Sequence, residues 1–203
     1  MIIKSGIKGI YMSWTCWDFD DWGANHIISD MCQSHDCRDA LLQLKSANSN
    51  FRVTLFAIPG EMTWELANWC KENAEWVSLA VHGFFHTSNY ECEKMNYRTF
   101  DILMDTVQEH WPSSFIRGFK APGWQISDDI YKWLLDNGWW VADQAYNDER
   151  RPKGLPVYKV GENSVHGHTW NCVGNGIYET LPQLLEKVKQ TDDFRFVSEV
   201  VNG

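Results

Sequence analysis

Positive charge is scarce in this sequence and is not gathered in any one place. The 18 lysines and arginines are outnumbered by 27 aspartates and glutamates, so the formal net charge is -9 at pH 7. The one adjacent basic pair, Arg150 and Arg151, stands beside Pro152, which is typical of a loop. An acidic chain without a basic stripe is unsuited to nucleic acid or to an anionic membrane, so neither is expected as a partner.

Long apolar runs are also missing. No stretch is apolar enough to span a bilayer, and residues 1–6 lack the features of an export signal, so we expect a cytoplasmic protein. Its six cysteines are then expected to be reduced thiols. Cys32 and Cys37, with His35 between them, could belong to a zinc site. Because no second ligand pair accompanies them, chance cysteines in a flexible or helical segment are favoured.

Internal repeats, low-complexity tracts and linkers are absent from the sequence as well. A length of 203 residues suffices for one sizeable core, so we expect a single domain over residues 1–203. The hydrophobic content of 44% is ordinary for a globular protein. Tryptophan is unusually frequent, with 12 residues. Packing explains most of them, and a few could line a groove for sugar rings.

Apolar strands and amphipathic helices alternate along the chain. Expected strands cover residues 9–15, 52–58, 76–81, 115–120, 139–142, 157–160, 163–165 and 194–198. Expected helices cover residues 36–47, 63–73, 97–110, 127–138 and 178–189, with Thr63 and Ser127 as N-caps and Gly138 as the end of a helix. This alternation predicts a parallel sheet, and about seven strands in a chain of this length favour a distorted (β/α) barrel over an open sheet.

Polar side chains follow the carboxyl ends of the expected strands. They are Asp20, Asp21, His82, Lys120, Asp143, His166 and His168. In a parallel barrel these strand ends share one face, and that face carries the chemistry. The sequence therefore predicts an active site at this rim.

Asp21 and His82 of this set, together with His86, have the composition of a metal site. His82 and His86 are four residues apart, and we expect them to share one side of a helical turn. Together with Asp21 they form a set of two imidazoles and one carboxylate, which suits Zn, Fe or Co and leaves positions open for water and substrate. An acidic turn at residues 20–21 and a chance histidine pair are the alternatives.

The remaining polar positions suggest acid–base chemistry, although each also has a structural explanation. Lys120 could pair with a carboxylate, or extend to the surface as lysines commonly do. Asp143 could orient a histidine, or cap a loop. His166 and His168 are separated by one glycine, so they point to the same side, and one is a candidate general acid.

In their order along the chain, these motifs resemble those of the NodB-type polysaccharide deacetylases, carbohydrate esterases with a distorted (β/α) barrel. The Thr-Phe-Asp-Asp-Gly motif of that family is similar to residues 18–22, and its His-Ser/Thr-x-x-His motif to residues 82–86. Residues 54–60 are similar to its second strand, and residues 120–123 to its Arg-x-Pro motif. Asp18, Trp22, Gly83 and Lys120 depart from the family pattern, which indicates a divergent branch.

The resemblance implies a role for each of these residues. Asp20 is the general base, and Asp21, His82 and His86 bind the metal. Lys120 takes the place of the arginine that positions the base. Asp143 raises the pKa of the histidine that protonates the leaving amine, which is His168 by preference and His166 otherwise.

The resemblance also implies an activity. We expect a metal-dependent hydrolase that acts on a non-peptide carbon–nitrogen bond and removes an acyl group, N-acetyl in the first instance, from an amino sugar or polysaccharide. Hydrolysis of another linear or cyclic amide, or an inactive carbohydrate-binding relative, are the alternatives. The expected cofactor is one divalent ion, zinc first, with Co²⁺, Ni²⁺, Fe²⁺ or Mn²⁺ also compatible. The expected partner is a carbohydrate or a small amide.

Overall fold

A computed structural model of the chain describes residues 14–24, 27–29, 32–33, 36–161, 163–169 and 176–201. The first expected strand, residues 9–15, therefore lies mostly outside the described residues. So do His35 and the side chain of Cys32 from the cysteine cluster considered above, whereas Cys37 is a buried free thiol. Of the helices within these ranges, none is both long and apolar enough to cross a membrane.

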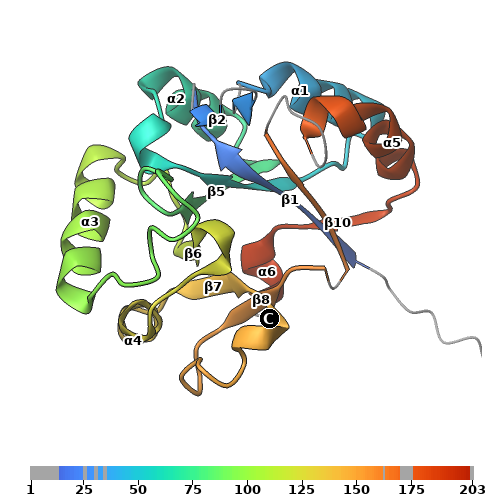
Figure 1. Cartoon of the computed structure of the whole chain (residues 1–203). Helices are drawn as coiled ribbons and strands as arrows, with labels where there is room; N and C mark the ends of the chain where they lie inside the picture. The colour runs from blue at the N-terminus through green and yellow to red at the C-terminus, as the bar shows by residue number, and fades with distance from the viewer. Residues whose placement is uncertain are drawn as a thin grey trace, which may run out of the picture.

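Strands and helices alternate along most of the chain (Figure 1). The strands are β1 (Trp14–Trp22), β2 (Ile27–Ser29), β3 (Cys32–Gln33), β4 (Val53–Ala57), β5 (Val77–His82), β6 (Gly118–Lys120), β7 (Trp140–Asp143), β8 (Val157–Lys159), β9 (Ser164–His168) and β10 (Asp193–Arg195). The α-helices are α1 (Arg38–Ala47), α2 (Trp64–Glu72), α3 (Tyr97–His110), α4 (Asp128–Asp136), α5 (Ile177–Lys189) and α6 (Val197–Val201).

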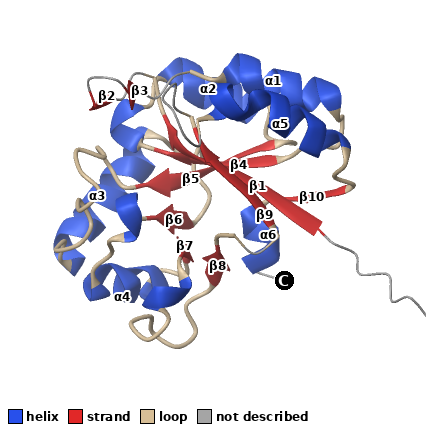
Figure 2. Ribbon diagram, turned by 45° about the vertical axis from the view of Figure 1, so that its right-hand side comes forward, coloured by secondary structure: helices blue, strands red, loops and turns tan. Residues whose placement is uncertain are grey.

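All the strands except β2 and β3 belong to one parallel sheet. Its order is β10-β1-β4-β5-β6-β7-β8, and β9 also pairs with β1. Figure 2 shows β4, β5, β9 and β10 about β1, with β6, β7 and β8 following below them. Helices α1, α2 and α5 lie on one side of the sheet, and α3 and α4 lie beside β6 and β7. The curled parallel sheet confirms the distorted α/β barrel that the alternation of strands and helices predicts.

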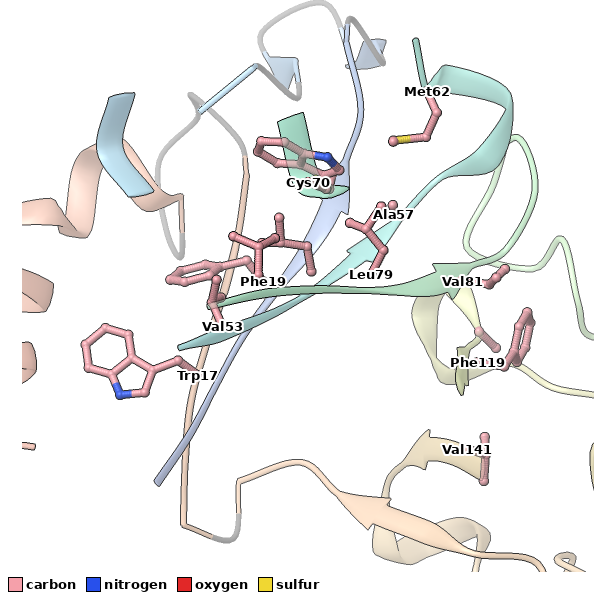
Figure 3. Packing of buried hydrophobic residues seen from close by; sticks show 14 of the residues in the cluster. Trp17, Phe19, Val53, Ala57, Met62, Cys70, Leu79, Val81, Phe119 and Val141 are labelled. Carbon is pink, nitrogen blue, oxygen red and sulfur yellow. The ribbon is translucent and has the colours of Figure 1, made fainter. Parts of the chain in front are cut away.

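The two faces of the sheet differ in what they bury. Alternate residues of each strand face the helices and form the main core, including Phe19, Val53, Leu79, Phe119 and Val141 (Figure 3). The residues between them face the inside of the curl. A second apolar cluster lies there, made of Cys16, Phe56, Ala80, Trp140, Ala142, Tyr158 and Val197. A side chain's place in this alternation therefore decides whether it can reach the inside of the barrel.

Local signals set the helix ends as the sequence predicts. The Thr63 hydroxyl accepts a hydrogen bond from Leu66 N at 3.2 Å, and the Ser127 hydroxyl accepts one from Ile130 N at 3.2 Å. Gly138 follows α4 with a φ of 67°, a conformation that glycine adopts without strain.

Two expected boundaries near the chain end are wrong. The strand expected at residues 163–165 runs on through His168, because β9 pairs with β1 in register from Cys16 opposite Ser164 to Asp20 opposite His168. The strand expected at residues 194–198 is the short β10, and α6 begins directly after it at Val197. The two histidines of β9 therefore lie within a strand and not in a loop that follows it.

Phe100 of α3 links the core to the strand ends, and we expect its removal to destabilise the folded protein. It is fully buried, with ring centroids 5.6 Å from Phe84, 5.1 Å from Phe119 and 5.0 Å from Trp133. We expect Phe100→Ala to lower the free energy of unfolding by about 3–5 kcal/mol in urea titrations. Ile102→Ala, at a 56% exposed position of the same helix, should change it by less than about 0.5 kcal/mol. Similar losses in both variants would contradict this packing.

Candidate metal centre and catalytic site

An irregularity in β1 brings Asp20 and Asp21 to the same site. Phe19 is opposite Leu55 of β4 and Trp22 is opposite Ala57, so β1 contains one extra residue between these pairs. Asp21 adopts a φ of 64°, which is unusual for a residue other than glycine. In a regular strand the two aspartates would point to opposite faces. The extra residue places both carboxylates between the outward-facing Phe19 and Trp22.

The bulge is held by the segment that follows β9. Thr169 is fully buried, and its backbone N–H donates to the carbonyl oxygen of Asp20 at 2.9 Å. Its hydroxyl donates to the carbonyl oxygen of Asp21 at 2.7 Å. These bonds satisfy the backbone carbonyl groups of Asp20 and Asp21 at the bulge.

Asp21, His82 and His86 come together with the spacing of metal ligands. The Nε2 atoms of His82 and His86 lie 3.3 and 3.2 Å from Asp21 Oδ1. Zinc bonds of about 2.0–2.1 Å in a tetrahedral site place neighbouring ligand atoms about 3.3 Å apart, so the three side chains fit one zinc-sized ion. All three are at least nine-tenths buried.

The environment of His82 also suits a metal ligand. Its Nδ1 lies 3.1 Å from the carbonyl oxygen of Lys120, which can only accept a hydrogen bond. Nδ1 therefore carries a proton, and in the neutral imidazole the lone pair of Nε2 faces Asp21. Metal-binding histidines commonly have such a partner on the other ring nitrogen.

The two histidines do not share a helical turn, so that expectation is wrong. His82 is the last residue of β5, and His86 lies in the loop after it with a φ of 49°. Gly83 between them has a φ of 58°, and a Cβ atom there would lie 2.7 Å from Pro122 Cγ. Both facts explain why glycine stands where the deacetylase motif has serine or threonine.

Glu91 organises this loop. Its Oε1 accepts hydrogen bonds from the backbone N–H groups of Phe84 and Phe85 at 2.9 and 3.2 Å, and its Oε2 accepts one from His86 N at 2.6 Å. One carboxylate thus holds three consecutive amides. These contacts position the His86 imidazole from outside the metal site.

Lys120 is fully buried beside Asp20. Its Nζ donates to Asp20 Oδ1 at 2.6 Å and lies 4.8 Å from the ring centroid of Phe56 and 4.2 Å from that of Trp124. Burial alone would raise the pKa of Asp20, but the Lys120 ammonium, with the nearby histidines, holds it below its usual range. The Asp20 carboxylate is therefore ionised at neutral pH, as a general base must be.

The hydrogen bonds of Asp143 go to residues other than His166 and His168, so its expected role toward a histidine stays a prediction. The phenol of Tyr131 donates to its Oδ2 at 2.6 Å, Arg151 donates to the same oxygen at 2.7 Å, and Asn147 donates to Oδ1 at 2.8 Å. The reason lies in the alternation of β7. Val141 faces the helices, so Asp143, two residues on, points to that same outer side.

Asp18 is the carboxylate that pairs with a histidine. It is fully buried, and His166 Nδ1 donates to its Oδ1 at 2.7 Å. The Tyr158 hydroxyl donates to its Oδ2 at 3.0 Å. The Nε2 atoms of His166 and His168 lie 3.8 and 3.9 Å from Asp20 Oδ2. The histidine held by a carboxylate is thus His166, whereas the sequence-based hypothesis preferred His168.

The histidine pKa was expected to be raised by Asp143, and for His168 the direction is the opposite. Burial lowers the pKa of His168 below its usual value, although the Asp20 and Asp21 carboxylates oppose the shift.

A pocket of about 190 Å³ opens at the centre of the site. Its lining includes Asp20, Asp21, His82, His86, Trp124 and His168.

The buried charges of the site do not balance. The carboxylates of Asp18, Asp20 and Asp21 and the ammonium of Lys120 are each at least 95% buried. Burial lowers the pKa of His82, but Asp20 and Asp21 raise it above its usual value. When all the imidazoles are in the neutral form that binds metal ions, three carboxylates and one ammonium leave two negative charges. A buried charge without compensation is costly, and one divalent cation at Asp21, His82 and His86 would neutralise the site.

Of the residues that the sequence alone does not assign to the site, only Asp18 has a recognisable signal. Asp18 is two residues before Asp20, so a regular strand puts both on one face. Glu91 and Thr169 have no such signal, because they act through backbone amides and carbonyls of other segments. Arg151, expected in a loop, is buried against Asp143 through a contact that no local pattern predicts.

Comparison with known proteins identifies solved structures of the same fold but no matching sequence family. No protein-family model and no curated protein matches the sequence. Among solved structures, the chitin deacetylase of Colletotrichum lindemuthianum superposes with a TM-score of 0.61 at 12% identity, covering 93% of this chain and 87% of the other. A peptidoglycan N-acetylglucosamine deacetylase gives 0.59 at 16% identity, covering 94% and 88%.

A family 4 acetyl xylan esterase from Clostridium thermocellum, solved with a cobalt ion, gives a TM-score of 0.57 at 10% identity, covering 93% of this chain and 90% of the other. At such identities the likeness establishes the fold. The chain has the fold of the family 4 carbohydrate esterases, which confirms the NodB-type fold that the motifs predict.

Glu91 provides a test of how the metal centre is held. We expect Glu91→Ala to weaken zinc binding by about 10–100-fold, because the loop carrying His86 loses three backbone hydrogen bonds. Competition with a chromogenic chelator measures the affinity. Glu93→Ala, at an exposed position two residues away, is the matched control and should leave it unchanged. An unchanged zinc affinity in Glu91→Ala would show that the loop does not depend on this carboxylate.

Proposed function

We propose that the protein is a metal-dependent deacetylase that removes an acyl group, N-acetyl in the first instance, from an amino sugar or polysaccharide. The observation that carries the proposal is the pairing of two features in one pocket. Asp21, His82 and His86 converge with metal-ligand spacing, and the ionised Asp20 stands beside them, held by Lys120. Metal-assisted hydrolysis needs a cation site and an adjacent base, and this arrangement supports both.

The cofactor in this proposal is one divalent ion held by Asp21, His82 and His86. Two imidazoles and one carboxylate suit zinc, and Co²⁺, Ni²⁺, Fe²⁺ or Mn²⁺ are compatible with the same set. When bound, such an ion polarises the acyl oxygen and makes a water molecule more acidic. The charge deficit of the site supports a single divalent ion.

The side chains of the chain itself divide the proton transfers. Asp20 accepts the proton of the attacking water through Oδ2, because Oδ1 is bonded to Lys120. Lys120 keeps Asp20 ionised and fixes its orientation. His166 takes up this proton on Nε2, which lies 3.8 Å from Asp20 Oδ2, and donates it to the departing nitrogen, while Asp18 holds the opposite ring nitrogen and stabilises the transient imidazolium.

The surroundings of the pocket support a ring-shaped substrate. Trp124 lines the pocket with a φ of 62°, a conformation that is costly for a bulky residue and that is commonly kept at functional sites. Its ring covers Lys120 and lies 6.2 Å from that of His166. The structural neighbours that are deacetylases of chitin and of peptidoglycan support an N-acetylated sugar as the first substrate to assay.

Substitutions of Asp20 and Asp21 are expected to differ in their effects on activity and on bound zinc. Asp20→Asn should lower acetate release from N-acetylglucosamine oligomers by at least about 10²-fold, with the bound zinc unchanged, because the base is lost and no ligand is. Asp21→Asn should lower both acetate release and zinc content. Elemental analysis and an acetate assay measure the two quantities, and zinc lost from Asp20→Asn alone would reverse the assignment.

The same assay separates the proposed activity from its alternatives. Turnover of N-acetylated oligomers by the wild-type protein, absent in Asp20→Asn, supports a deacetylase. Turnover confined to small linear or cyclic amides would favour the alternative amide hydrolase. Binding to a glycan array without turnover of any substrate would favour a binding protein and contradict the proposal.

The assignment of the acid predicts a dependence on the leaving group. An amine departs poorly without a proton, whereas an activated ester does not need one. His166→Ala should therefore lower the rate on amides by about 10²–10⁴-fold and the rate on an activated acetate ester much less. His168→Ala should affect both substrates alike. A selective loss on amides in His168→Ala would return the role to His168, as the sequence-based hypothesis had it.

A further inference from the structure

A second group of metal-ligating atoms lies beside the proposed metal centre. Asp20, His166 and His168 each offer one ligand atom, and these atoms lie within 4.8 Å of one another. The Nε2 atoms of the two histidines are 3.8 and 3.9 Å from Asp20 Oδ2. These two distances exceed the separation of about 3.3 Å between ligand atoms of a tetrahedral zinc by only about half an ångström.

His166 is already oriented as metal-binding histidines are. Its Nδ1 donates to Asp18 Oδ1 at 2.7 Å, which leaves the lone pair of Nε2 facing Asp20. Asp18 is itself fixed by the Tyr158 hydroxyl at 3.0 Å. A carboxylate behind an imidazole is the usual support of a metal ligand. His168 stands on the same face of β9 two residues on, with ring centroids 5.2 Å apart.

Lys120 supplies the positive charge that this group would otherwise take from an ion. Its ammonium is 2.6 Å from Asp20 Oδ1 and 3.8 Å from Asp18 Oδ1, and the side chain is fully buried. With Lys120 in place, one divalent ion neutralises the buried carboxylates and a second would leave an excess of two positive charges. Without Lys120, the buried deficit grows to three negative charges, which favours a second cation.

We infer that Asp20, His166 and His168 form a second divalent-cation site, which the Lys120 ammonium keeps closed. The inference rests on the proposed function, since it takes the ion at Asp21, His82 and His86 as the first. Lys120 then does two things: it orients the base, and it restricts the centre to one ion. A cluster of four imidazoles and three carboxylates thereby remains mononuclear.

The test is the number of zinc ions bound by Lys120→Met, whose side chain is similar in length and uncharged. Protein dialysed against zinc and freed of excess by gel filtration should hold one equivalent in the wild type and two in Lys120→Met. Lys120→Arg is the matched control, because it keeps the cation, and should hold one. Lys120→Met combined with His166→Ala should return to one.

A second measurement covers the case in which Lys120→Met is unstable without metal. The variant refolded in excess zinc should gain thermal stability beyond the first equivalent, because an ion that binds only the folded state stabilises it. Lys120→Gln should behave in the same way. One equivalent in both variants, or two in the wild type, would overturn the inference and leave the proposed function intact. A wild-type protein with no bound ion would instead contradict the proposed function.

Discussion

Three buried carboxylates beside a single ammonium are the constraint around which this structure is arranged. Asp18, Asp20 and Asp21 come from one strand, and Lys120 comes from β6, three strands away in the sheet order. Such a group is unfavourable unless each charge has a partner. Lys120 compensates part of the negative charge, and His166 and Tyr158 donate hydrogen bonds to Asp18. In our proposal, a divalent ion at Asp21 would compensate the remainder. The same imbalance supports the proposal that the folded protein binds a metal ion at this group.

The alternation of strand residues decides which polar side chains can join this group. The inward positions of β1, β5, β6 and β9 carry Asp18 and Asp20, His82, Lys120, and His166 with His168. Asp21 would face outward, and the bulge in β1 turns it inward. Asp143 lies on the outward side of β7 and stabilises the loop that carries Arg151 instead. One bulge and one rule of alternation thus account for the composition of the site.

Much of this could be predicted from the sequence, and what could not has physical reasons. The strand–helix alternation, the caps at Thr63 and Ser127 and the rim that carries the site follow from local patterns. The hydrogen-bond partners of Asp143 do not follow from its place at a strand end, because that place alone does not tell which face of the sheet the side chain takes, although counting from Val141 indicates it. A separation of four residues occurs both in a helical turn and in the loop between His82 and His86, so the spacing alone does not distinguish the two. Glu91 and Thr169 act on distant backbone groups, and only the fold brings these together.

The account is tested most directly by locating the metal. Anomalous diffraction from crystals of the purified protein, recorded above and below the zinc absorption edge, reports both the element and its position. A single peak bonded to Asp21 Oδ1 and to the Nε2 atoms of His82 and His86, with none between Asp20, His166 and His168, is the predicted result. No peak at Asp21 in zinc-loaded crystals, or a peak bonded to Asp20 in the wild-type protein, would contradict it.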